Sequence, residues 1–163
     1  MMKLVKWITK MQPFFNKISN NPYLRAIRDG FISLIPVILF SSIFLLIAFV
    51  PNAFGYFLPD NIVTVLMKAY SLSMGILAIL MSSTIARSLT DNFNLKMPKT
   101  RQINTVSVMI AAIISFLLLS TDLKDGAISL DYLGTKGLLT SFIIGFTIPN
   151  IYKFCVGRNI TIK

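Results

Sequence analysis

The chain has 163 residues, of which 55% are hydrophobic and only 13% are charged. A soluble domain carries about a quarter charged residues and could not bury this much apolar surface, so a soluble globular protein is excluded. The net charge of +10 comes from lysines and arginines dispersed over several segments without a nucleic-acid-binding motif, so no nucleic-acid partner is predicted.

Residues 1–29 are predicted to form a cytoplasmic amphipathic segment. Apolar side chains recur there at helical spacing, and lysines fall mainly on the opposite side: Leu4, Trp7, Ile8, Met11, Phe15 and Ile18 against Lys3, Lys6, Lys10 and Lys17. Such a helix lies in the membrane interface with its lysines toward anionic lipid, or it docks on the protein's own cytoplasmic surface. The sequence favours neither arrangement.

Four apolar runs are long enough to cross the lipid bilayer, at about 30–50, 66–86, 103–120 and 137–156. Lys68 and Lys153 lie near span ends, where their long stems carry the ammonium group to the lipid headgroups. Pro149 predicts a kink or an early exit in the last run. The fold class is therefore an all-α membrane protein with about four transmembrane helices, and residues 30–163 form its transmembrane domain.

Basic residues alternate along the chain in the order that the positive-inside rule requires. Segment 1–29, the connection 87–102 and the tail are rich in lysine and arginine, whereas the connections 51–65 and 121–136 are not. Both termini are therefore predicted to lie in the cytoplasm.

Small residues recur at spacings of three and four along two of the runs, which predicts close helix packing there. These residues are Ser71, Gly75, Ala78 and Ser82 on the second run, and Ser107, Ala111 and Ser115 on the third. Contacts are expected within the chain or with a second copy, and a large side chain at Gly75 is expected to weaken them.

The sequence carries little reactive chemistry. It has no histidine, and its six acidic residues are all aspartates that lie in predicted loops or at the ends of spans. General acid–base catalysis mostly uses histidine, glutamate or aspartate, and Cys155 is the only cysteine. No catalytic residue, metal site or cofactor is therefore predicted, and no span holds the deep ionisable residue that couples many secondary transporters to ions.

Two separated stretches carry a family resemblance. The first reads Leu-Arg-Ala-Ile-Arg-Asp-Gly-Phe-Ile-Ser-Leu-Ile-Pro over 24–36, and the second is the turn 133–138 with the fourth run and the basic exit 151–163. Together they resemble the EIIC permease components of the bacterial phosphoenolpyruvate-dependent sugar phosphotransferase system, in the lactose/cellobiose/diacetylchitobiose branch. The matching residues are Arg25, Arg28, Asp29, Gly30, Pro36, Gly134, Gly137 and Arg158.

The resemblance implies a multi-pass protein of the bacterial cell membrane that acts in sugar transport with EIIB and EIIA components. EIIC holds and moves the sugar, a β-linked disaccharide such as cellobiose being expected here, and a phosphohistidine on EIIB supplies the phosphoryl group. Family members are much longer. Their N-terminal half packs as a dimerisation scaffold, and their sugar site, with a histidine and a glutamate, lies in the C-terminal half. We therefore expect a truncated chain that lacks the sugar-binding half and is inactive alone.

Two other classes stay open on the sequence alone. One is a self-contained small transporter of four helices, although such exporters typically embed a glutamate in the first span and this chain has none. The other is a holin-like or regulatory membrane protein without a substrate. Lysis of the cells that express the chain would favour this class.

Overall fold

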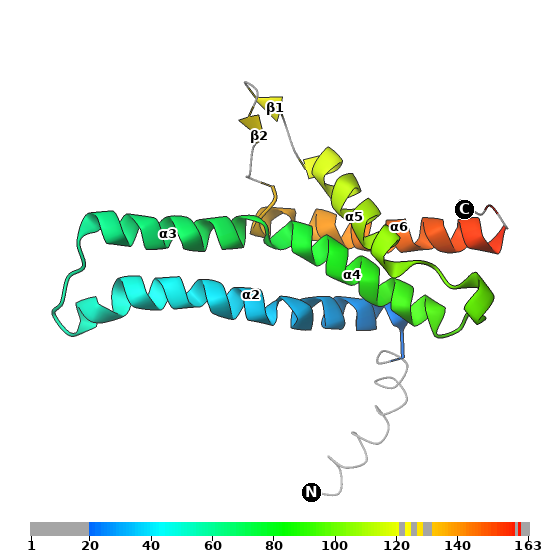
Figure 1. Ribbon diagram of the computed structural model, residues 1–163, viewed down its shortest axis with the longest axis horizontal. Coiled ribbons are helices and arrows are strands. Elements are labelled where there is room, and N and C mark those ends of the chain that lie inside the picture. The colour runs from blue at the N-terminus through cyan, green and yellow to red at the C-terminus, as the bar shows by residue number, and fades with distance from the viewer. Residues whose placement is uncertain (1–19, 121–122, 125–126, 129–131, 159, 161–163) are drawn as a thin grey trace, which may run out of the picture.

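The computed structural model describes residues 20–120, 123–124, 127–128, 132–158 and 160. The amphipathic helix predicted near the N-terminus falls on residues 1–19, outside this described part. The described helices and strands are α2 (Pro22–Ala53), α3 (Asp60–Gly75), α4 (Leu77–Asn94), η1 (Lys99–Arg101), α5 (Thr105–Ser120), β1 (Leu123–Lys124), β2 (Ala127–Ile128), η2 (Thr135–Gly137) and α6 (Leu138–Gly157) (Figure 1).

Four helical stretches are long and apolar enough to cross a membrane: Pro22–Ala53, Asp60–Asn94, Lys99–Ser120 and Thr135–Gly157. The predicted fold class, an all-α membrane protein with about four spanning helices, is confirmed. The antiparallel pair of two-residue strands, β1 and β2, lies in the connection between the last two stretches. The cytoplasmic location of the termini stays a prediction.

Helix α2 begins where local chemistry favours a helix start. Asn21 caps the helix, because its side-chain oxygen accepts a hydrogen bond of 2.9 Å from the backbone N–H of Tyr23, and Pro22 occupies the first turn. The helix continues for 32 residues with Pro36 and Pro51 inside it. At 1.5 Å per residue it is roughly 48 Å long, so it exceeds the hydrocarbon layer.

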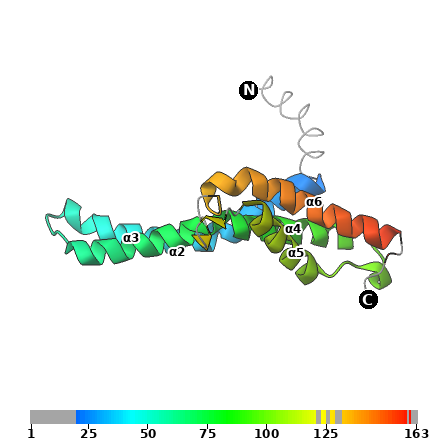
Figure 2. The same cartoon turned by 90° about the horizontal axis from the view of Figure 1, so that it is seen from above.

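Helices α2 and α3 form an antiparallel hairpin that extends well beyond the other helices (Figures 1 and 2). Gly55 supports the turn between them, since its φ of 80° is a left-handed conformation that favours glycine. The tip of the hairpin presents Phe54, Tyr56 and Phe57, which are 75–80% exposed. Of these side chains, the tyrosine is of a type that is enriched at membrane–water interfaces.

The second apolar run is not one continuous helix. Helix α3 ends at Gly75 and α4 begins at Leu77, and the φ and ψ of Ile76 are −105° and 7°. The turn before α6 stabilises this break, because the backbone N–H of Ala78 donates to the carbonyl of Leu133 at 2.9 Å. The predicted span 66–86 therefore lies across a break between two helices.

Helix α4 lies at the centre of the bundle. It packs against α2 through one group of buried side chains and against α5 and α6 through another. Its buried residues are Leu77, Ala78, Met81, Ser82, Ser83, Ile85, Ala86, Leu89, Thr90 and Phe93, whereas α3 buries none. The other helices leave much of their apolar surface exposed, as helices surrounded by lipid do.

The small-residue stripes occupy different environments. In α4, Ala78 and Ser82 are buried, while in α3 Ser71 is exposed and Gly75 has open space where a side chain would begin. The break at Ile76 separates the two halves of this stripe. The backbone of Gly75 nevertheless lies close to Gly134, whose added Cβ would be 3.4 Å from the Gly75 Cα. Helix packing through Gly75 stays a prediction.

In α5 the buried face is the stripe Val108, Ala112 and Phe116, one position along from the predicted one. Ser107 is exposed, and Ala111 and Ser115 are half-buried. Helix α5 is apolar all round, so the spacing of small residues does not decide which stripe faces α4. A contact of the predicted stripe with a second copy stays a prediction.

A methyl group added at Gly145 would lie 2.8 Å from the Ile85 side chain, so Gly145→Ala is expected to destabilise the bundle. We expect a loss of about 1–3 kcal/mol, the usual effect of overpacking. The matched variant Gly75→Ala meets no atom within 4 Å, so we expect unchanged or slightly higher stability. Thermal unfolding in detergent measures both, and equal melting temperatures would contradict the assigned packing.

Candidate functional site

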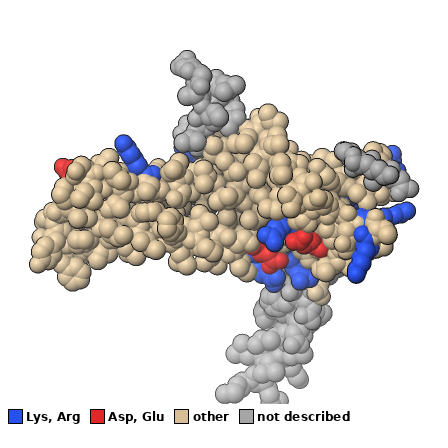
Figure 3. All heavy atoms as spheres, in the orientation of Figure 1, with Lys and Arg blue, Asp and Glu red and all other residues tan. Residues whose placement is uncertain are grey.

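The charged residues gather at one end of the bundle. Helix α2 begins there, α4 ends, α5 begins and α6 ends, because successive helices alternate in direction (Figure 1). Figure 3 shows lysine, arginine and aspartate side chains concentrated at this end, while the face of the α2–α3 hairpin is almost uncharged. The described parts of the basic segments that the positive-inside rule assigns to one compartment thus lie at the same end of the bundle.

Asp29 joins α2 to α4 at this end. One carboxylate oxygen accepts a hydrogen bond of 2.8 Å from Nε of Arg28 and forms an ion pair of 2.7 Å with the same guanidinium, and the other accepts a hydrogen bond from the Ser88 hydroxyl at 3.1 Å. The next residue, Gly30, lets the two helices approach closely, since an added Cβ would lie 2.8 Å from the Ile85 side chain. The Arg-Asp-Gly part of the first resembling stretch is therefore a contact between helices.

Tyr23 joins three helices just beside this point. Its hydroxyl donates to the Asn150 side chain at 3.0 Å, and its ring meets Phe93 and Phe146 edge-on, with centroids 6.4 and 5.4 Å away. The Lys153 ammonium lies 4.2 Å above the Phe93 ring, a cation–π contact. Sequence reasoning missed this cluster, because its members come from α2, α4 and α6 and no spacing along the chain relates them.

The end of α4 is fixed to the start of α5 by two polar side chains. Asn94 forms a pair of 2.8 Å hydrogen bonds with the backbone N–H and C=O of Ile103. The Thr105 hydroxyl donates to Asp91 at 2.9 Å, so this carboxylate also serves a contact between helices. These bonds hold the basic connection 95–104 against the bundle.

The second resembling stretch forms the tight turn that contacts the helix break. An added Cβ at Gly134 would lie 3.1 Å from the carbonyl oxygen of Met74, and one at Gly137 would overlap the carbonyl oxygen of Tyr132. Close backbone approach therefore requires glycine at Gly137, while a side chain at Gly134 needs a shift of a few tenths of an ångström at the helix break. Of the other matching residues, Pro36 is exposed within α2, and Arg158 lies over the Phe154 ring at 4.5 Å.

Comparison with known proteins identifies the family. The family described as "Phosphotransferase system, EIIC" matches residues 28–163 of this chain. The chain belongs to this EIIC family. It is accordingly a multi-pass protein of the bacterial cell membrane, and its four apolar helical stretches agree with this.

The curated relatives agree with this family. Over its whole length the chain is 56% identical to the PTS system lactose-specific EIICB components of Staphylococcus epidermidis RP62A and Staphylococcus aureus COL. It spans 28% and 29% of these two proteins, less than a third of their length. No solved structure was found to match the chain.

Tyr23→Phe is expected to lower the free energy of unfolding by about 1 kcal/mol, because the side-chain oxygen of Asn150 loses the hydroxyl that donates to it. The matched variant Tyr56→Phe removes a hydroxyl from a side chain that is 75% exposed, and it is expected to have no effect. Thermal unfolding of both variants in the same detergent makes the comparison. A Tyr23→Phe protein as stable as Tyr56→Phe would show that the hydrogen bond contributes nothing.

Proposed function

We propose that this chain provides the N-terminal membrane scaffold of the EIIC permease component of a sugar phosphotransferase system. The observation that carries the proposal is the EIIC family match over 28–163, supported by 56% identity to part of the lactose-specific relatives. In this proposal residues 30–163 correspond to the N-terminal half of an EIIC domain. Cytoplasmic residues 1–29 precede that domain.

The geometry at the charged end suits a scaffold. Asp29 and Asp91 hold helices together, as do Tyr23 and Asn94. Helix α4 is enclosed by α2, α5 and α6, so the centre of the bundle is filled by packed side chains. Sugar binding is therefore proposed to use residues of the EIIC component outside this chain, and this chain alone is proposed to be inactive.

The proposed partners follow from the family. EIIB and EIIA components would supply the phosphoryl group, which agrees with a chain that contains no histidine. A second copy of the chain is the proposed dimer partner. The exposed apolar faces of α2, α3 and α5 offer surface for that contact and for lipid.

The proposed sugar is a β-linked disaccharide. The relatives are named lactose-specific, so lactose is favoured over the cellobiose expected from the sequence. Because the specificity residues are proposed to lie outside this chain, the relatives' names are the support for this choice.

A split-protein experiment tests the scaffold. Cells without their own lactose EIIC would express this chain alone, or together with the part of the Staphylococcus aureus EIICB protein that it does not match. We expect no saturable lactose uptake from the chain alone and restored uptake, with accumulation of phosphorylated sugar, from the pair. Gly145→Leu should abolish restoration through the Ile85 clash, while Gly75→Leu should preserve it. Saturable uptake by the chain alone, or none by the pair, would contradict the proposal.

A chimera tests whether this chain carries residues that determine which sugar is taken up. This chain would replace the matching portion of the Staphylococcus epidermidis EIICB protein, with the rest of that protein unchanged. We expect lactose uptake with an apparent KM within about threefold of the parent, and no gain of cellobiose uptake, because the sugar contacts are unaltered. Radiolabelled uptake with both sugars measures this. A switch to cellobiose would show that specificity residues lie in this chain.

A further inference from the structure

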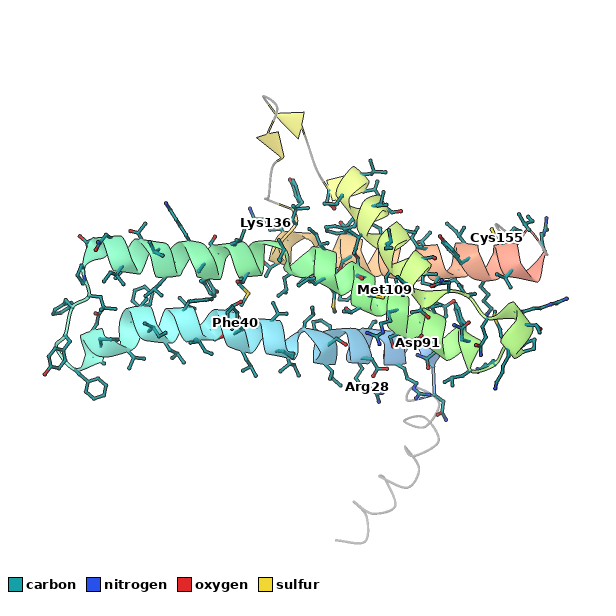
Figure 4. All side chains as sticks on the ribbon, in the orientation of Figure 1. Arg28, Phe40, Asp91, Met109, Lys136 and Cys155 are labelled. Atoms are coloured by element: carbon teal, nitrogen blue, oxygen red, sulfur yellow. The ribbon has the colours of Figure 1, made fainter. Side chains whose placement is uncertain are left out.

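A polar hollow of about 330 Å³ lies between the beginning of α2 and the end of α4. Arg25, Asp29 and Ser33 line it from α2, one helical turn apart, and Arg87 and Asp91 line it from α4. Figure 3 shows the corresponding group of basic and acidic side chains on the face toward the viewer, and Figure 4 labels Asp91 on α4 where it faces α2. The scaffold contacts described above use the aspartates of this hollow but neither Arg25 nor Arg87.

The carboxylates of the hollow already have partners. Both oxygens of Asp29 are engaged, one by Arg28 and the other by Ser88. Asp91 accepts from Thr105 at 2.9 Å, and its second oxygen lies 3.8 Å from Nε of Arg87. Since Asp29 is paired with Arg28 and the acid nearest to Arg87 is Asp91, no described aspartate at this end of the bundle is left to balance the charge of Arg25.

The guanidinium groups of Arg25 and Arg87 are less well paired with acidic side chains. Arg25 is half-buried, and it forms no ion pair with any acidic side chain in the part of the chain that the structure describes. Arg87 reaches its aspartate only at 3.8 Å, which is too long for a hydrogen bond. A partly buried guanidinium without a partner is unfavourable, and its planar set of donors fits a phosphate or carboxylate.

Two further features favour an anion here. No acidic residue occupies the first turn of α2, so the positive end of the helix dipole adds to the charge of Arg25. The uncharged run that starts at Gly30 begins directly beside the hollow, which places the hollow at the level of lipid headgroups. Exposed Phe31, Ile32 and Ile35 follow on α2 and offer apolar surface for acyl chains.

We propose that this hollow binds one phosphate-type oxyanion, with Arg25 and Arg87 as its ligands. Two sources share this chemistry: the headgroup of an anionic phospholipid, and a free phosphate from the aqueous side. The proposal does not depend on sugar uptake, so its test is separate from the test of the permease role.

Thermal unfolding of the full chain in neutral detergent tests the site. Phosphatidylglycerol, phosphatidylcholine and inorganic phosphate would be added separately. We expect phosphatidylglycerol or phosphate to raise the melting temperature by roughly 3–6 °C at saturation, and phosphatidylcholine to leave it unchanged. A response to phosphatidylglycerol alone assigns the site to lipid, and a response to inorganic phosphate assigns it to the free ion. No response to either overturns the proposal.

Variants that remove the charge of one arginine test whether Arg25 and Arg87 bind the anion. Arg25→Gln and Arg87→Gln are expected to lose the ligand-induced shift, and Arg25→Lys to keep part of it. The matched control Arg158→Gln removes the same charge from a side chain that lies over Phe154 at the end of α6, and it should keep the full shift. If Arg25→Gln does not fold, Arg87→Gln decides, because that side chain is 63% exposed. A full shift in Arg87→Gln overturns the proposal.

Native mass spectrometry of the wild-type chain gives a second readout. The chain would be released from detergent with equal amounts of phosphatidylglycerol and phosphatidylcholine, and separately with inorganic phosphate. We expect at least a threefold excess of one bound phosphatidylglycerol over phosphatidylcholine, or a single phosphate adduct, and a loss of that adduct in Arg87→Gln. Equal retention of the two lipids without a phosphate adduct overturns the proposal.

Discussion

The bundle depends on the side chain of Ile85, which α2 and α6 approach from different directions. A Cβ at Gly30 or at Gly145 would lie 2.8 Å from this side chain, so both helices place a glycine where they contact α4. Lipid provides little hydrophobic drive between helices, and close backbone approach must therefore supply the dispersion energy that holds them together. These two contacts hold α2 and α6 against α4, and α4 is therefore central between them.

Hydrogen bonds at the charged end of the bundle fix how the packed helices are oriented. Tyr23 pairs with Asn150, Asp29 with Ser88, and Asn94 with the backbone of Ile103, so each neighbour of α4 is fixed at the same end. Near hydrocarbon such bonds have less competition from water, and they define the rotation of each helix about its axis. Apolar contacts alone leave that rotation open, as the all-round apolar surface of α5 illustrates.

The sequence was sufficient for features that depend on composition over some twenty residues. Hydrocarbon-length runs predicted the number of spanning stretches, and the motif around Asp29 and Gly30 predicted the EIIC family. The break at Ile76 was missed because a hydrogen bond to Leu133, distant in the chain, stabilises it. Gly145 was missed because a single glycine has no periodic partner. The buried stripe on α5 lies one position along from the predicted small-residue stripe, since an evenly apolar helix gives no signal for the side that faces its neighbour.

The turn that contacts the helix break has a consequence for solvent access. Met74 and Leu77, on either side of the break, belong to the same hydrophobic cluster as Leu34 and Ile38. The turn at 132–137, which contacts the break at Met74, therefore lies inside the uncharged run of α2 that starts at Gly30. Irregular backbone at this depth occurs only where protein covers it or water reaches it, since its amide groups would otherwise be stranded in hydrocarbon. Acyl chains alone therefore cannot surround that flank of the bundle, which must adjoin an aqueous recess or further polypeptide.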